Sequence, residues 1–403
     1  MSPDPARPPI PRDAADDLAP GIVGARRELW ASVTGSPPRH VSGQPVEPEQ
    51  ARGKIENFVG FAQVPLGLAG PLRLDTSAGM REVYVPMATT EGAMVASYSR
   101  GMRLLAAAAD SRGGRGARAR VLGEGLTQDP ILVYPDAEQA SRAASSASAQ
   151  FAELQAIVAG TTSHGRLVAL RPEVIGRRLV LVLVFTTGDA IGINMAARAA
   201  DLVSAEVAKR TGALARYVHG QDVEKRANAR ALVEGRGRRV VCDVTIPRDS
   251  LAGIARASPE DLVAILKSYA VGFAALGTQN WTVQSANGLA AVMLACGQDV
   301  AYVTESATGL LDFDVDARGD LYASVHLPSL IVGTVGGGSG QGTARECLEL
   351  LGCAGEGGAN VFAEILGATV LAGDLSLMAA FASHEFVAAH ERLGRNRPSG
   401  AGD

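Results

Sequence analysis

The order of strands and helices between residues 115 and 245 constrains the fold of this chain more than any other feature. Short apolar runs alternate there with two Ala-rich segments of helical length, and the run at 178–185 is nearly continuous in Val and Leu. Strands are predicted at 131–134, 168–170, 178–185 and 239–245, and helices at 136–159 and 192–211. This β-α-β-β-α-β order is typical of a small ferredoxin-like domain.

The segments on either side of this region are predicted to form a second, larger domain, because a chain of 403 residues is too long for one simple core. Residues 51–114 and 246–397 are assigned to it, with residues 115–245 inserted and residues 398–403 as a tail. Its helices are predicted at 258–276, 281–296, 344–351, 361–384 and 385–393, with a strand at 321–326 and a helix capped by Thr89 or Thr90. The predicted fold class is α+β, with a large, mainly helical domain and a small inserted ferredoxin-like domain.

The first 50 residues differ in composition from the rest. Ten of the 20 prolines fall within residues 1–48, a segment rich in Ala and Asp with little apolar periodicity. Such a segment buries too little apolar surface to fold by itself. We therefore expect residues 1–50 to be a mobile arm, with order beginning around Ile55.

Charge and hydropathy exclude several functions. The formal net charge is −4 and no long basic stripe is present, so nucleic acid is not an expected partner. The arginine-rich stretch at 112–120 is interpreted as a solvated loop. No apolar run reaches the ~18 residues that span a bilayer, and no signal peptide is apparent, which predicts a cytoplasmic protein without a membrane partner. The four cysteines lack metal-ligand spacing, so we expect buried free thiols and no metal.

Two loops could bind an anionic ligand. The glycine loop Gly333-Thr-Val-Gly-Gly-Gly-Ser-Gly-Gln-Gly342 precedes a predicted helix whose free N–H groups favour an anion, although a tight turn explains it equally well. The second loop, at 186–195, joins an apolar strand to a helix and carries Asp189 and Asn194. Such junctions are common in nucleotide sites and equally common as simple turns.

Three ionisable residues have apolar neighbours in the sequence: Glu91, Lys267 and Asp299. Desolvation shifts the pKa of such groups, which is typical of functional sites. The simpler interpretation is a helix cap for Glu91, and an exposed helical position for His390.

These motifs together resemble one family, the class I 3-hydroxy-3-methylglutaryl-CoA reductases, in a soluble, bacterial-type form without a membrane anchor. The resemblance covers residues 54–395 and keeps the family's order. The matching segments are Glu56-Asn-Phe-Val-Gly-Phe61, Val64-Pro-Leu-Gly-Leu-Ala-Gly-Pro-Leu72, Val85-Pro-Met-Ala-Thr-Thr-Glu-Gly92, Gly188-Asp-Ala-Ile-Gly-Ile-Asn-Met195, Glu234-Gly-Arg-Gly237 with 240–247, Ala295-Cys-Gly-Gln-Asp299, 333–338 and Leu371-Ala-Gly-Asp-Leu-Ser-Leu-Met378.

The resemblance implies a reaction, in which a CoA thioester is reduced through a hemithioacetal and an aldehyde to an alcohol, with two NADPH consumed. It implies that Glu91 donates a proton at the aldehyde stage and that the Lys225 ammonium stabilises the oxyanion. Asp299 would hold Lys225, and His390 would protonate the departing CoA thiolate. Since the sequence identifies no contact to a 2′-phosphate, NADPH follows from the resemblance and NADH is not excluded.

The resemblance also implies binding residues and an assembly. The dinucleotide would contact Asp189, Ile191, Gly192, Asn194, Met195, Gly336, Gly337 and Gly338. The acyl-CoA substrate would contact Lys267, Asn287, Arg100, Ser163 and Arg166. The active site would lie at the subunit interface of a homodimer or higher homo-oligomer, with Glu56 and Asn57 near that contact.

Four positions depart from the family pattern. Ser163 stands in place of the Arg that holds the distal carboxylate of the acyl group, unless a shift of a few residues brings Arg166 there. In addition, Val218 replaces a Ser, Glu224 an Asp and Gln284 a His. Losing a charge-assisted pair with a carboxylate could cost ~2–4 kcal/mol of binding.

Three hypotheses therefore stay open. The first is reduction of 3-hydroxy-3-methylglutaryl-CoA to mevalonate and free CoA. The second is reduction of another acyl thioester, carried by CoA or a carrier protein. The third is a nucleotide- or CoA-binding homologue that reduces nothing.

Only four of the 38 basic residues are lysines, namely Lys54, Lys209, Lys225 and Lys267. A coding bias toward Arg explains their scarcity. Lys225 and Lys267 nevertheless fall on the positions to which the resemblance assigns catalysis and substrate binding. An ammonium is a compact charge that can lose its proton, whereas a guanidinium is wide and stays charged. We expect Arg to be tolerated at Lys54 and Lys209.

Overall fold

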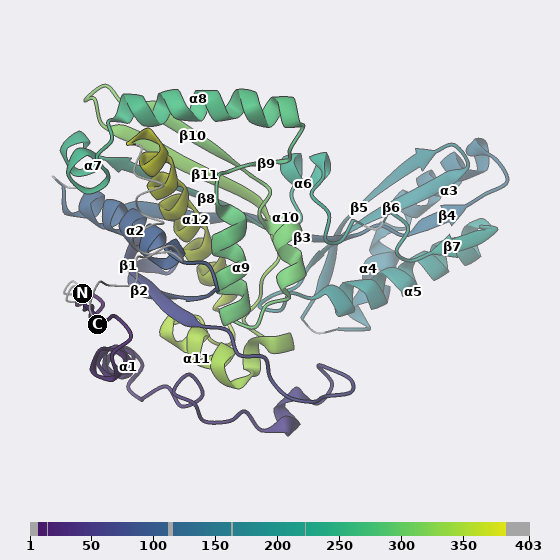
Figure 1. Cartoon of the computed structure of the whole chain (residues 1–403). Coiled ribbons are helices and arrows are strands. Elements are labelled where there is room, and N and C mark those ends of the chain that lie inside the picture. The colour runs from purple at the N-terminus through teal and green to yellow at the C-terminus, as the bar shows by residue number, and fades with distance from the viewer. Residues whose placement is uncertain (1–6, 14, 112–115, 163, 222, 384–403) are drawn as a thin grey trace.

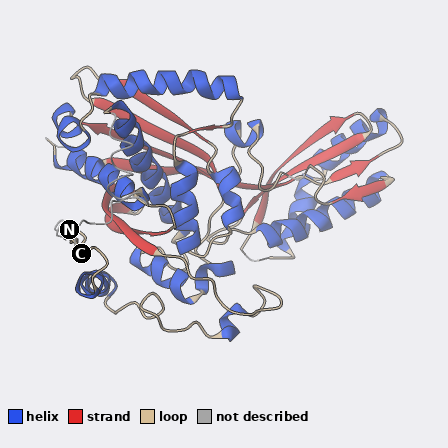
Figure 2. Cartoon of the chain, in the orientation of Figure 1, coloured by secondary structure: helices blue, strands red, loops and turns tan. Residues whose placement is uncertain are grey.

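The structure, a computed structural model, describes residues 7–13, 15–111, 116–162, 164–221 and 223–383. A large sheet covered by helices and a smaller sheet that projects from its side are joined by one strand, β3 (Ala117–Gln128), which pairs in both (Figure 1). Strands and helices are mixed in both parts (Figure 2), which confirms the predicted α+β class.

The large sheet is mostly antiparallel. Along β8 (Gly237–Ile246) every second residue is buried, which is the period of a strand with one face on a core. The strand order is β2 (Gly79–Ala88), β1 (Leu66–Thr76), β3, β8, β11 (Leu321–Leu330), β10 (Gly309–Val315) and β9 (Asn280–Trp281).

The helix α12 (Ala359–Ala382) passes through the middle of the large part, against α2 (Met94–Asp110) and β8 (Figure 1). Nearly all of its residues are buried, including Glu364 and Asp374. The other helices of this part are α7 (Arg248–Ala255), α8 (Pro259–Leu276), α9 (Ser285–Ala295), α10 (Val303–Ser306) and α11 (Gly342–Leu350), with 3₁₀ turns at Pro48–Ala51, Val300–Tyr302 and Gly337–Gly340.

Among the described residues, α12 alone has the length and apolar character of a membrane span. This corrects the expectation that no segment would. However, 83% of its most apolar window is buried inside the fold, as in the core helix of a soluble protein.

The small sheet has the strand order β7 (Ala215–Tyr217), β4 (Ile131–Val133), β6 (Arg178–Thr186) and β5 (Arg166–Ile175). The helices α3 (Ala137–Ala149), α4 (Phe151–Ala159) and α5 (Ile193–Thr211) pack on it, and α6 (Ala229–Val233) follows. The β-α-β-β-α-β order is present, but its last strand is β7 and not the predicted 239–245. Residues 239–245 belong to β8 of the large sheet. The strand β7 was missed because its three residues are too few to show the alternation of apolar and polar residues that marks a strand.

Three further expectations need correction. Residues 64–72, whose Pro and Gly residues predict a compact loop, belong mostly to β1. The arginine-rich stretch enters β3, where Arg120 pairs with Asp75 at 2.8 Å. The period of two in Ala117, Ala119 and Val121 was the missed signal of β3. The helix after Thr89 begins only at Met94, and the helix predicted at 385–393 lies outside the described residues.

The N-terminal segment also differs from the expected arm. Residues 20–34 form α1 (Pro20–Thr34), whose Leu29 and Trp30 are buried in the large core. The carboxylate of Glu346 on α11 accepts the backbone N–H groups of residues 39, 40 and 41 at 2.7 to 3.0 Å. Regular structure therefore begins well before Ile55, because one buried aromatic and one carboxylate compensate for the poor apolar pattern.

Candidate active site

The two loops predicted to bind a dinucleotide lie against each other. The backbone oxygen of Asp189, in the turn between β6 and α5, accepts hydrogen bonds from Thr334 N at 2.8 Å and Val335 N at 3.1 Å. A Cβ atom at Gly333 would lie 2.5 Å from Ile191 N, so the contact requires glycine. The structure thus brings the turn and the glycine loop into one place.

The Asp189 carboxylate is already engaged by the protein. Its Oδ2 accepts Gly357 N at 2.7 Å and its Oδ1 accepts Ala359 N at 3.1 Å, at the start of α12. Beside it, the buried Arg238 donates to the backbone oxygens of Gly188 and Val332. Asp189 therefore fixes the turn, and Asn194, exposed in the first turn of α5, is the freer polar group.

The glycine loop supplies an open surface for an anion. Gly336 and Gly337 have φ of 78° and 55°, are exposed, and would meet no atom within 4 Å if they carried a Cβ. They lie just before α11, whose first N–H groups favour a negative charge. These residues fit the phosphates of a dinucleotide.

The same loop packs on the turn that carries Asp299. A Cβ at Gly338 would lie 2.5 Å from the backbone oxygen of Gly297, and Gln298 Oε1 accepts Gly333 N at 2.9 Å. The loop and the Asp299 turn are therefore in direct backbone contact.

Lys225 and Asp299 form an ion pair next to this loop. Lys225 Nζ lies 2.9 Å from Asp299 Oδ2, and 4.9 Å from the centre of the Tyr302 ring. Asp299 Oδ1 also accepts Ala301 N at 3.0 Å, which fixes the carboxylate. Both side chains keep more than 40% of their exposure, so the ammonium is accessible to a substrate oxygen.

A second carboxylate adjoins this pair. Glu224 Oε1 accepts Gln128 Nε2 from the end of β3 and lies 3.4 Å from Arg236 Nη2, and its Oε2 accepts Tyr302 Oη at 3.1 Å. Burial, followed by the charge of Glu224, raises the pKa of Tyr302 well above its usual value, so Tyr302 stays a neutral donor.

Of the other two predicted catalytic residues, Glu91 lies within the described part of the chain. Glu91 lies exposed between β2 and α2, where its backbone N donates to Thr89 Oγ1 at 3.0 Å. Within the described part of the chain, Glu91 makes no hydrogen bond or ion pair with Lys225 or Asp299. His390 and Ser163 lie outside the described residues.

The predicted substrate-binding residues lie on several elements. Lys267 and Asn287 are exposed on α8 and α9. Arg100 donates from α2 to the side-chain and backbone oxygens of Ser376 on α12. Arg166 pairs in register with Thr186, the last residue of β6 before the turn that carries Asp189.

Sequence reasoning missed the residues that support these groups: Gln128, Arg236, Arg238, Gln298 and Glu305. Only the two arginines left a signal in the sequence, because Arg236 and Arg238 stand at alternate positions at the start of an apolar strand. The structure shows that both are buried. One predicted departure is explained: Gln284 is buried and donates to Gly373 O in the core.

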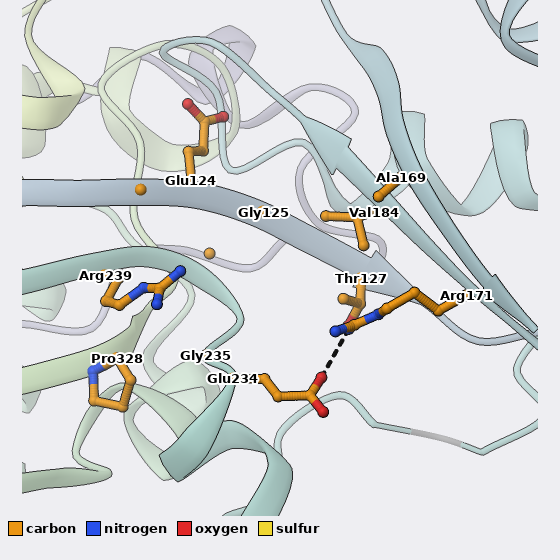
Figure 3. Close-up of a pocket in the computed structure, with 12 residues that line it drawn as sticks. Glu124, Gly125, Thr127, Ala169, Arg171, Val184, Glu234, Gly235, Arg239 and Pro328 are labelled. Atoms are coloured by element: carbon orange, nitrogen blue, oxygen red, sulfur yellow. Dashed lines mark ion pairs between the residues drawn. The ribbon is translucent and has the colours of Figure 1, made fainter. Parts of the chain in front are cut away.

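A cavity of about 240 Å³ lies at the junction of the two sheets (Figure 3). Gly125, Gly235 and Gly237 line it, and Arg171 and Glu234 form an ion pair across its edge at 2.8 Å. Lys225 and Asp299 are not among its lining residues.

Comparison with known proteins gives one consistent result. Residues 22–395 match the family described as hydroxymethylglutaryl-coenzyme A reductase. The chain is 37% identical to a 3-hydroxy-3-methylglutaryl-coenzyme A reductase of Methanothermobacter thermautotrophicus, over 93% of each chain. It is 42% identical to that of Halobacterium salinarum, over 85% of this chain and 84% of the relative.

The fold is shared with a class II 3-hydroxy-3-methylglutaryl-CoA reductase of Streptococcus pneumoniae, whose structure was solved bound to NADPH. The TM-score is 0.73 at 20% sequence identity, and the match covers 89% of this chain and 96% of that one. The family match spans both sheets and every loop described above. The chain therefore belongs to the hydroxymethylglutaryl-coenzyme A reductase family.

Proposed function

We propose that this protein reduces 3-hydroxy-3-methylglutaryl-CoA to mevalonate and free CoA with two NADPH. The observation that carries the proposal is the Lys225–Asp299 ion pair, held at 2.9 Å on a turn whose Gly297 packs against Gly338 of the glycine loop. This places an accessible ammonium beside loops that fit a dinucleotide, which is what carbonyl reduction requires.

Each protein group has one task in this scheme. NADPH, when bound, supplies the hydride in both reductions. The Lys225 ammonium donates a hydrogen bond to the carbonyl oxygen as negative charge develops there, and Asp299 fixes the ammonium. Glu91 is assigned the proton donation at the aldehyde stage, and His390 the protonation of the CoA thiolate.

A second copy of the chain is proposed to complete the site. The long helix α8 buries only Pro259 and Leu262, while Val271 and Leu276 on it are 72% and 80% exposed. Val59, next to Glu56 and Asn57, is fully exposed. An apolar face of this kind suits a homodimer, in which Lys267 on α8 would reach the partner's substrate.

The decisive experiment is NADPH oxidation by the purified protein with 3-hydroxy-3-methylglutaryl-CoA. We expect mevalonate and free CoA as products, and loss of turnover in Lys225→Ala with NADPH binding retained. A folded wild-type protein that binds NADPH but does not oxidise it would rule out the assignment.

One observation favours a second candidate, reduction of a different acyl thioester. Gln284, which stands where the family has a His, is buried and donates its amide N–H to Gly373 O, so this amide nitrogen is held by the core and not directed to an acyl group. A panel of CoA and carrier-protein thioesters tests this, and a preference for 3-hydroxy-3-methylglutaryl-CoA would exclude it.

A further inference from the structure

The Glu234-Gly-Arg-Gly237 segment packs unusually closely on β11. Gly235 and Gly237 have φ of 78° and 86°, and a Cβ at either would lie within 2.5 Å of the backbone oxygens of Pro328 and Leu330 respectively. Both glycines also line the cavity at the junction of the two sheets, where Figure 3 labels Gly235. Because neither has a side chain, the segment lies flat on β11, and Arg236 between them is buried.

Arg236 links three parts of the site. Its Nη1 lies 2.9 Å from both carboxylate oxygens of Glu305, and its Nε donates to Thr127 O at 3.2 Å. Its Nη2 lies 3.4 Å from Glu224 Oε1. The Glu305 side chain is fully buried on α10, so the pair is shielded from solvent, where charge-assisted hydrogen bonds are strong.

Glu305 in turn holds the backbone of Lys225. Its Oε1 accepts the N–H of Lys225, which adopts φ of 58°. A residue with a Cβ is strained in this left-handed conformation, which persists only where its surroundings impose it. The surroundings are anchored, because Glu305 and Glu224 both contact Arg236.

We propose that Arg236 and Glu305 are positioning residues that hold Lys225 in its left-handed backbone conformation and so place its ammonium between Asp299 and the Tyr302 ring. The proposal rests on the proposed function for its kinetic consequence but not for its geometry. The alternative is that the buried pair only stabilises the fold.

Glu364 provides a matched control for that alternative. It is a fully buried carboxylate too, and accepts hydrogen bonds from Ser77 N at 2.9 Å and Val121 N at 3.1 Å. Among the described residues it makes no hydrogen bond or ion pair with Lys225, Arg236 or Asp299. Glu305→Gln and Glu364→Gln should both lower Tm. Only Glu305→Gln should move Lys225.

The position of Lys225 can be read directly, because the chain has only four lysines. Reductive ¹³C-methylation gives one NMR signal for each, and Lys225→Arg identifies its own. In the wild type we expect this signal to be displaced upfield by the Tyr302 ring. Glu305→Gln should return it to the position of the exposed lysines, whereas Glu364→Gln should leave it displaced. An unmoved signal in Glu305→Gln would overturn the proposal.

Kinetics give a second, separate readout. Glu305→Gln should lower kcat about 100-fold for both the thioester and the free aldehyde, with the Kd for NADPH unchanged, because a misplaced ammonium weakens both hydride transfers. If folded Glu305→Gln keeps wild-type activity, the Arg236–Glu305 pair only stabilises the fold. If the wild type itself is inactive, the proposed function fails while the NMR result still decides the inference.

If Glu305→Gln does not fold, hydrogen exchange measured on the wild type tests the contact between Glu305 and the Lys225 backbone. The Lys225 N–H should then be protected from hydrogen exchange by its bond to a buried carboxylate. Exchange as fast as in an open loop would refute the contact.

Discussion

Gly338 and Gly297 touch through their backbones, so that a Cβ on Gly338 would lie 2.5 Å from Gly297 O. This contact joins the glycine loop to the turn that carries Asp299. The glycine loop and the Lys225–Asp299 ion pair are therefore mechanically coupled, and a change in the position of one should alter the position of the other.

The first prediction concerns this contact. Gly338→Ala should push the loop away from the Asp299 turn, because the clash is with rigid backbone, and should weaken NADPH binding at least tenfold (~1.4 kcal/mol) while also lowering kcat. Gly340→Ala in the same loop is the control, since it meets no atom within 4 Å and has no left-handed φ. NADPH fluorescence titration compares the two, and equal affinities would contradict the predicted clash.

The second prediction concerns the charge at Lys225. Lys225→Arg keeps a positive charge but replaces a compact ammonium with a wide planar group opposite Asp299. We expect kcat to fall on the order of 10²–10³-fold, as when an oxyanion donor is removed. Lys54→Arg and Lys209→Arg should keep wild-type rates in the same assay. Full turnover in Lys225→Arg would disprove the catalytic role.

The third prediction follows from the buried Asp374. Burial raises its pKa to about 7, although Gln284 N donates to Oδ1 at 2.7 Å. Oδ2 is buried and has no hydrogen-bond partner among the described residues. The unfolded carboxyl loses its proton near pH 4, whereas the folded one keeps it to about pH 7. The folded state thus binds more protons between these values, and its stability should fall as pH rises through this window.

Asp374→Asn removes that dependence while keeping an acceptor for Gln284 N. Its free energy of unfolding should match the wild type near pH 4 and exceed it above pH 7, by on the order of 1–3 kcal/mol. Urea unfolding across this range measures the difference between the two proteins. Burial also raises the pKa of Asp129 to about 6, but its contribution is the same in both and cancels. A constant difference at all pH values would exclude the assigned titration.

The fourth prediction tests the N-terminal helix. Trp30 is 4% exposed and belongs to the large core, so Trp30→Ala should lower the free energy of unfolding by about 3–5 kcal/mol. Leu18→Ala, at a position 82% exposed, should change it little. Chemical denaturation of both variants distinguishes a packed helix from a loose arm, since a loose arm predicts no loss for Trp30→Ala.

The sequence predicted the parts of the fold that carry a strong local pattern. The apolar run of β6, the following helix and the glycine loop lie where they were expected. The family resemblance implied a contact between Lys225 and Asp299, and the structure contains this ion pair, while the catalytic roles of the two residues stay a prediction. The four cysteines are buried free thiols, as predicted.

Features that depend on distant contacts could not be predicted. Three residues of β7 form a strand only because β4 is beside them, and α1 is ordered by a core that lies far along the chain. Glu305 had no local signal, since its role appears only when Arg236 and Lys225, separated by ten residues of irregular and helical chain, meet it in space.

The strand β3 has a consequence for how the molecule unfolds. It pairs with β1 and β8 through its first residues and with β6 through its last, without a break between the two sheets. Loss of the large sheet would leave residues 117–125 of β3 without their strand partners, and loss of the small sheet would do the same to residues 126–128. The two sheets should therefore melt together in a single calorimetric transition, and the smaller one should not fold when expressed alone.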